Sequence, residues 1–154
     1  MENKNLILQQ LLSKILVKKV IDRFHNVLID NKISHAEISR KAGKNEGAFN
    51  KTFNEAEDLK FSSFLRYWHA FKLLENGKHS SPVKFEDLLD SEAHNILDLL
   101  SHLKNYDLNS ISAEDIKLLQ NLKYYYYQLR SKNALTKCEM DIYEKLLKTL
   151  KRGE

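Results

Sequence analysis

A short segment of this chain, residues 33–54, gathers polar side chains of the types that hydrogen-bond to bases and phosphates. Asn and Glu pair with the exocyclic amines of adenine and cytosine, whereas Lys and Arg neutralise phosphates. Glycine lets a backbone come close to a groove. The candidate nucleic-acid contacts in this segment are His35, Arg40, Lys41, Lys44, Asn45, Glu46, Gly47, Asn50, Lys51 and Asn54.

Two short helices joined by a turn are predicted to position these side chains. Ser34 and Glu37 have the spacing of a capping box, which starts a helix that runs to about residue 42. Gly43 is placed to close this helix in a left-handed conformation. Asn45 then caps a second helix that begins at Glu46 and continues to about residue 53.

The second helix is expected to turn its apolar residues inward and its polar residues outward. Asn50 would then pair with N6 and N7 of adenine, Glu46 would accept from N4 of cytosine, and Gly47 would permit close backbone approach. Phosphate contacts are expected from His35, Arg40, Lys41 and Lys44. The alternative is an ordinary solvated helix face, because any surface helix is polar.

The sequence ISHAEISRKAGKNEGAFNKTFN, residues 33–54, resembles the helix-turn-helix of phage-repressor-type (lambda repressor-like) proteins. Ile38 and Ser39 stand at the apolar and small positions where the first helix touches the second. Gly43 stands at the turn glycine and Phe49 at the buried anchor of the second helix. With a helix before and a helix after, the resemblance covers residues 20–75.

Two positions depart from the pattern of this family. Lys44 follows the turn glycine, where the family usually has an apolar residue, and Thr52 replaces a residue that is often bulky and apolar. Both changes weaken the expected packing between the two helices. The resemblance implies a sequence-specific DNA-binding transcriptional regulator that reads the major groove with the helix at residues 46–53.

The remainder of the chain also shows helical periodicity. With 4 Gly and 1 Pro in 154 residues, the chain has too few turn residues for a β fold, and we predict an all-α protein. Residues 5–30 form one long helix or two. Further helices are expected at residues 63–74, 91–103, 112–130 and 136–150, with a single helical turn at 85–89. Ser62 or Ser63 is expected to cap the first of these helices and Ser112 the third, and Thr136 with Glu139 has the spacing of a capping box at the start of the last.

The turn-rich stretch at residues 75–82 is the predicted domain boundary. Residues 1–76 would form a five-helix-type helix-turn-helix domain with an N-terminal leader helix. Residues 83–154 would form a helical hairpin or small bundle that serves dimerisation or partner binding.

The formal net charge of +4 is unevenly distributed along the sequence. Residues 1–79 hold 14 basic and 9 acidic residues, a net charge of +5, whereas residues 80–154 hold 11 and 12, a net charge of −1. A basic half followed by a neutral half is typical of a polyanion-binding module joined to an interaction module. Ordinary surface variation would produce the same asymmetry.

Other classes of function lack a sequence signal. No nucleophile elbow, HExxH or phosphate-binding glycine loop is present, so we expect no enzyme activity and no cofactor. The six histidines include no pair at three- or four-residue spacing, which argues against a metal site. The lone Cys138 and the lack of a long apolar run favour a cytoplasmic protein without membrane insertion.

These observations lead to two functional hypotheses. The first is a transcriptional regulator of a phage or mobile element, which binds double-stranded DNA as a homodimer or with a protein partner. The second is a protein-interaction adaptor or antirepressor that uses the helix-turn-helix as a packing scaffold. The modest charge favours the second, as do Glu55, Glu57 and Asp58, which follow the predicted recognition helix.

Overall fold

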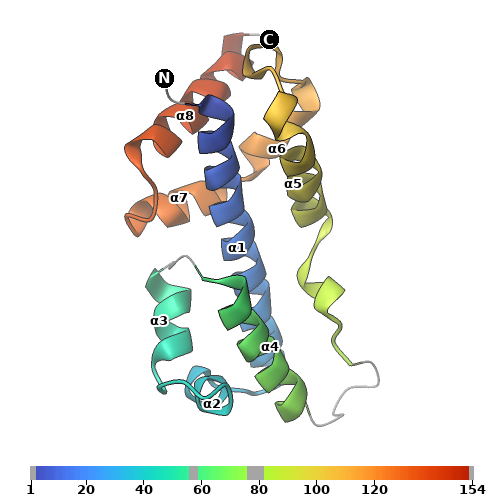
Figure 1. Cartoon of the computed structure of the whole chain (residues 1–154), viewed down its shortest axis with the longest axis vertical. Helices are drawn as coiled ribbons and strands as arrows, with labels where there is room; N and C mark the ends of the chain where they lie inside the picture. Colours follow the sequence, from blue (N-terminus) through green and yellow to red (C-terminus); the bar gives the residue numbers. More distant parts are fainter. Residues whose placement is uncertain (1–2, 56–58, 76–81, 153–154) are drawn as a thin grey trace. The chain divides into compact units, whose positions relative to one another are not determined.

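The structure is a computed structural model that describes residues 3–55, 59–75 and 82–152. Every regular element in these ranges is helical, so the protein is all-α, as the scarcity of glycine and proline predicts. The α-helices are α1 (Lys4–Asp30), α2 (His35–Lys41), α3 (Ala48–Glu55), α4 (Phe61–Leu74), α5 (Ser91–His102), α6 (Ala113–Asn121), α7 (Lys123–Ser131) and α8 (Lys137–Arg152) (Figure 1). Short 3-10 helices are η1 (Phe85–Leu88), η2 (Leu103–Asn105) and η3 (Leu108–Ser110).

The chain divides into two compact units that differ from the domains expected from the sequence. The central unit is Lys19–Leu88, and the terminal unit combines Met1–Lys18 with Leu89–Glu154. The expected boundary at residues 75–82 lies largely outside the described residues, and η1 belongs to the central unit. The first half of α1 belongs to the terminal unit, and four of its apolar residues are fully buried: Leu8, Leu11, Leu12 and Ile15.

The core of the central unit is built around the ring of Phe24 on α1. This ring makes edge-to-face contacts with Phe49, Phe64 and Phe71, at centroid distances of 5.6, 5.4 and 5.9 Å. Each such pair contributes roughly 0.5–1.5 kcal/mol beyond the burial of apolar area. Phe85 of η1 also packs against Phe64, at 5.9 Å, so η1 completes this core.

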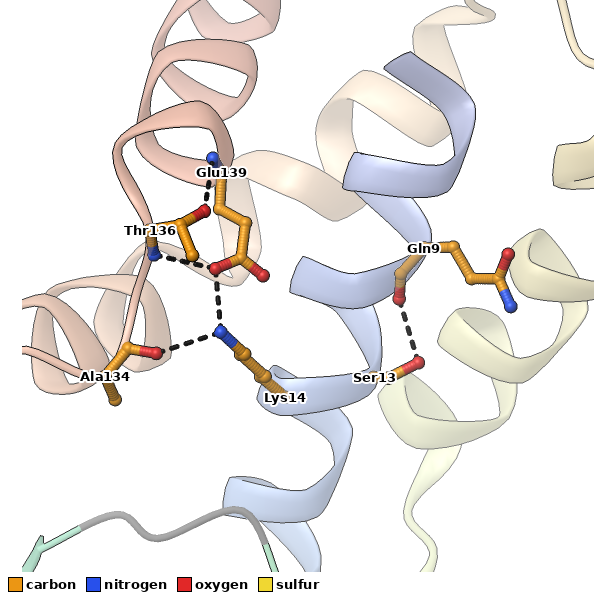
Figure 2. A network of polar contacts seen from close by, with 6 residues as sticks. All are labelled: Gln9, Ser13, Lys14, Ala134, Thr136 and Glu139. Carbon is orange, nitrogen blue, oxygen red and sulfur yellow. Dashed lines mark hydrogen bonds and ion pairs between the residues drawn. The ribbon is translucent and has the colours of Figure 1, made fainter. Parts of the chain in front are cut away.

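The terminal unit contains a buried charge pair at the start of α8 (Figure 2). The predicted capping box is confirmed, because the Glu139 N–H donates to Thr136 Oγ1 at 3.1 Å and the Thr136 N–H donates to Glu139 Oε1 at 2.8 Å. Lys14 Nζ of α1 donates to the same Oε1 at 2.7 Å and to the Ala134 carbonyl at 3.0 Å. The first turn of α8 is therefore tied to α1 within this unit.

The prediction of a single helix at residues 112–130 is wrong, because the structure has two helices there, α6 and α7, separated at Leu122. In a continuous helix the Leu119 carbonyl would accept from the N–H four residues later. Here the hydroxyl of the buried Tyr143 donates to that carbonyl. The Leu122 N–H is instead shared between the Leu118 and Leu119 carbonyls, at 3.2 and 3.3 Å.

Several helix boundaries also follow from local capping. Ser34 Oγ accepts from the Glu37 N–H at 3.0 Å and starts α2, as predicted. Residues 5–30 form one helix, which decides between the two alternatives for this segment. Ser62 and Ser63 do not cap α4, because this helix already begins at Phe61.

In the part of the chain that is described, no helix is both long and apolar enough to cross a bilayer.

Candidate nucleic-acid interface

The turn between α2 and α3 is closed by a Schellman motif at Gly43. Gly43 has φ +75°, its N–H donates to the Arg40 carbonyl at 2.9 Å, and the Lys44 N–H donates to the Ser39 carbonyl at 2.9 Å. This pair of bonds satisfies the last carbonyls of α2 and requires a left-handed residue, which favours glycine. The predicted role of Gly43 is confirmed.

Ser39 joins α2 to the first turn of α3. Its fully buried hydroxyl donates to the His35 carbonyl at 2.7 Å and accepts from the Phe49 N–H at 3.0 Å. Phe49 is also fully buried and packs against Phe24 and Tyr67, with centroid distances of 5.6 and 5.1 Å. The expected contact of Ser39 with the second helix and the expected anchoring role of Phe49 are confirmed.

The second helix begins at Ala48, two residues later than predicted. The Ala48 N–H donates to the Asn45 carbonyl at 3.0 Å, so residues 45–47 form a turn ahead of α3. The physical reason is that Ser39 supplies the acceptor for Phe49, the second residue of the helix. This acceptor comes from α2, and the local capping pattern at Asn45 does not reveal it.

The residues predicted to face outward are exposed. In the turn these are Asn45, Glu46 and Gly47, and on α3 they are Asn50, Lys51 and Asn54. A Cβ atom built on Gly47 would meet nothing within 4 Å, so a ligand could approach the backbone at this point. The arrangement presents a polar surface made of one turn and one face of α3.

The two departures from the family pattern find local compensation. Thr52 is buried, and its hydroxyl donates to the Ala48 carbonyl at 3.1 Å. Lys44 is half-buried and places Nζ 5.2 Å from the centre of the Tyr67 ring, where a cation is attracted to the aromatic face. These two residues therefore fit the packing between the helices.

Arg40 and Glu46, both predicted contacts, form an ion pair with each other. The distance from Arg40 Nη1 to Glu46 Oε1 is 2.8 Å, and the side chains are 55% and 66% exposed. A pair this exposed contributes at most about 1 kcal/mol, so it can open when a ligand offers better partners. Glu46 could accept from cytosine only in that open state.

His35 does not present a ring nitrogen that is free for phosphate. Its Nε2 lies 2.7 Å from Nδ1 of His25, and its Nδ1 lies 3.1 Å from Oδ1 of Asn50. The expected phosphate contact would have to displace one of these partners. The structure instead places His35 behind Asn50, as a support for a predicted base contact.

Two residues of this region were missed by sequence reasoning. His25 lies on α1 and contacts His35 across the unit, a relation that no local spacing indicates. Arg66 lies on α4, and its Nη2 donates to the Ala42 carbonyl at 3.1 Å, at the C-terminal end of α2. A cation there complements the negative end of the helix dipole.

The two units have the same net charge, although the two halves of the sequence differ in theirs. The central unit holds 12 basic and 10 acidic residues, and the terminal unit holds 13 and 11, so each has a net charge of +2. The reason is that Lys4, Lys14 and Lys18 belong to the terminal unit. Attraction of a polyanion by the net charge of the central unit is therefore weak, and local side chains must supply the contacts.

Neither a metal-ligand cluster among the described residues nor a related protein adds to this description. Among the described residues, no group of three or more His, Cys, Asp and Glu side chains is arranged to hold a metal ion. Comparison with family models, curated proteins and solved structures finds no significant match to this chain.

Proposed function

We propose that the protein is a sequence-specific transcriptional regulator of a phage or mobile element that binds double-stranded DNA. The observation that supports this most is the α2–Gly43–α3 arrangement, with Phe49 anchored in the core and Asn50, Lys51 and Asn54 exposed on one face of α3. A helix about 10–12 Å across fits the major groove, which is about 12 Å wide.

The exposed side chains divide into two kinds of contact. Asn50 and Glu46 carry the groups suited to base edges, and Gly47 lets the backbone come close to them. Arg40, Lys41, Lys44 and Lys51 are suited to phosphates on either side of the groove. Such a regulator would act in the cytoplasm.

One reading helix makes few base contacts, so we expect the regulator to bind as a homodimer. Two copies would contact half-sites about 34–36 Å apart. The terminal unit carries exposed tyrosines on α7, Tyr124 at 63% and Tyr127 at 54%, and aromatic residues are enriched in protein interfaces. These tyrosines are the first candidates for the contact between copies.

The test is a fluorescence-polarisation titration of the full chain against duplexes drawn from the DNA that flanks its own gene. Lys51→Ala should weaken binding to all sequences and flatten the log–log salt dependence by about 0.9 per lost phosphate contact. Asn50→Ala should cost about 1–3 kcal/mol on the preferred duplex only. Lys104→Ala, which removes an exposed lysine from the terminal unit, is the matched control. Unchanged binding by both α3 variants would contradict the proposal.

A second candidate function is a protein-interaction adaptor or antirepressor. The net charge of +2 on the central unit and the Arg40–Glu46 ion pair favour it, because both reduce the free positive charge near α3. In that case the titration would show no binding to any duplex, whereas light scattering would still detect association with a protein partner. The salt-dependent titration therefore separates the two functions.

A further inference from the structure

A chain of hydrogen bonds runs through three helices of the central unit and ends at the exposed face of α3. His25 Nδ1 on α1 lies 2.7 Å from His35 Nε2 on α2, and His35 Nδ1 lies 3.1 Å from Asn50 Oδ1 on α3. Asn54 Nδ2 donates to the same Asn50 oxygen at 2.9 Å. One end of this chain is half-buried, and the other end is the residue proposed to read a base.

Both imidazole rings are held in place by aromatic neighbours. The His25 ring stacks on Phe53, with a centroid distance of 4.0 Å and an interplanar angle of 22°. The His35 ring meets the edges of Phe49 and Phe53 at 4.9 and 5.6 Å. These contacts fix the plane of each ring. A half-turn of a ring within its plane would keep them but would turn C–H groups toward the polar partners, so the hydrogen bonds decide which nitrogen faces each partner.

The chemistry of the partners then fixes the direction of the hydrogen bonds. A carboxamide oxygen only accepts, so His35 Nδ1 must carry the hydrogen that it shares with Asn50. In neutral His35 the other nitrogen, Nε2, is then an acceptor, and His25 Nδ1 must donate to it. With Asn54 Nδ2 also donating, both lone pairs of Asn50 Oδ1 are used within the protein.

We infer that His25 and His35 are positioning residues that make Asn50 a donor-only reader of the base edge. This inference rests on the proposed DNA-binding function. Reading adenine in the major groove needs one donor and one acceptor, whereas guanine presents two acceptors, N7 and O6. Because its oxygen is occupied, Asn50 offers only its Nδ2 hydrogens and selects guanine. This preference for guanine replaces the pairing of Asn50 with adenine that is expected from the residue type alone.

The first test needs no DNA. In 15N-labelled full-length protein, long-range 1H–15N correlations report which ring nitrogen of each histidine carries a hydrogen. The expected result is a hydrogen on Nδ1 of both His25 and His35. A neutral His35 without a hydrogen on Nδ1 would overturn the inference. Asn50 would then turn its Nδ2 toward His35 and its Oδ1 toward the groove.

The second test is selection by the full chain from a pool of duplexes with a randomised centre. The base position read by Asn50 is the one whose preference is lost in Asn50→Ala. Wild type should favour guanine over adenine there by roughly 5- to 150-fold. His35→Leu, which removes the donor, should abolish this preference. His35→Asn, whose amide nitrogen replaces Nδ1, should retain it.

The outcomes separate the inference from the function on which it rests. If wild type enriches no sequence, both the inference and the proposed DNA-binding function are overturned. If it enriches adenine at the position read by Asn50, the inference is overturned but the proposed function is not. If His35→Leu still prefers guanine, His35 does not determine the orientation of the Asn50 side-chain amide. Should His35→Leu fail to fold, as judged by circular dichroism, the tautomer measurement and His35→Asn decide the outcome.

Discussion

The hydroxyl of Ser39 bonds to two helices at once, as a donor within α2 and as the acceptor for the first turn of α3. Ser39→Ala would leave the Phe49 N–H buried without an acceptor, and we expect the free energy of unfolding to fall by about 1–3 kcal/mol. Urea denaturation followed by circular dichroism measures this loss.

Ser13 provides the matched control for the Ser39 prediction. Its hydroxyl makes the same bond to the carbonyl four residues earlier, in Gln9, at 2.8 Å, but it is exposed and no second helix depends on it. Ser13→Ala should leave the free energy of unfolding within about 0.5 kcal/mol. Equal losses in the two variants would show that the bond to Phe49 contributes nothing.

The ion pair of Lys14 with Glu139 is asymmetric in burial, with side chains 27% and 0% exposed. Lys14→Met would leave a buried carboxylate without its cation, and we expect a loss of about 3–5 kcal/mol in the free energy of unfolding. Glu139→Gln should cost less, because its amide oxygen still accepts from the Thr136 N–H and Lys14 can reach water. Thermal and urea unfolding of both variants measures these losses. A lower stability of Glu139→Gln than of Lys14→Met would contradict the prediction.

At the scale of elements, the turn between α2 and α3 depends on the conformation of Gly43. A Cβ at Gly43 would lie 3.5 Å from Arg66 Nη2, an ordinary contact, so any cost of a side chain comes from the positive φ. Gly43→Val should lower the free energy of unfolding by more than the roughly 1–2 kcal/mol of an unbranched residue, with a fall of several degrees in Tm.

Gly47 separates the structural requirement of this turn from the functional one. Its backbone does not have a positive φ, and the space around it is open, so Gly47→Val should leave Tm nearly unchanged. In the proposed complex with DNA, a side chain there would obstruct the approach of the duplex to the backbone. An unchanged Tm in Gly43→Val, measured beside this control, would contradict the role assigned to the Schellman turn.

The pairing of α7 with α8 depends on two buried tyrosines. Tyr126 stacks on Tyr143 at a centroid distance of 4.2 Å and donates to Glu144 Oε1 at 3.0 Å. Burial, the hydrogen bond and the negative charge of Glu144 together raise the pKa of Tyr126 to about 12. Burial also raises the pKa of Tyr143.

These shifts predict that the protein loses stability at alkaline pH. Between about pH 10 and 12 the unfolded chain releases tyrosine protons that the folded chain retains, so the free energy of unfolding falls as the pH rises. Urea denaturation across this range, with ultraviolet absorbance of tyrosinate, measures the slope. Tyr126→Phe should reduce the slope of the free energy of unfolding against pH, whereas Tyr124→Phe, at an exposed position, should not. An equal slope in Tyr126→Phe and wild type would argue against Tyr126 as a source of this pH dependence.

At the scale of the whole molecule, the central unit should fold without the terminal unit, provided that η1 is included. Leu88 is 1% exposed, and Phe85 packs against Trp68 at a centroid distance of 5.4 Å. A fragment of residues 19–88 should therefore unfold cooperatively. A fragment of residues 19–78 should be less stable by at least about 1.5–3 kcal/mol, the contribution of burying one leucine.

Circular dichroism during urea denaturation compares the two fragments directly. Equal midpoints would show that η1 is not part of the central core. A fragment of residues 1–88 offers a further comparison, because it exposes apolar residues of α1 that are buried in the full chain, such as Leu11 and Ile15. We expect this longer fragment to self-associate, as judged by light scattering.

The sequence by itself determined the all-α class, the closure of α2 at Gly43 and the capping of α2, α6 and α8. Ser34, Ser112 and Thr136 each bond to an N–H three residues ahead, so these signals lie within a single turn. The exposed set on α3 also followed from the sequence, since burial of Phe49 fixes the opposite face of a short helix.

Only the tertiary structure decided where α3 begins, where α6 ends and what surrounds Asn50. In each case a side chain from another helix occupies a group that local patterns treat as free: Ser39 at the Phe49 N–H, Tyr143 at the Leu119 carbonyl and His35 at the Asn50 oxygen. Helical periodicity states which face of a helix is buried, but it does not state which polar atom of a neighbouring helix meets that face. The direction of the His25–His35–Asn50 chain is therefore a property of the folded unit.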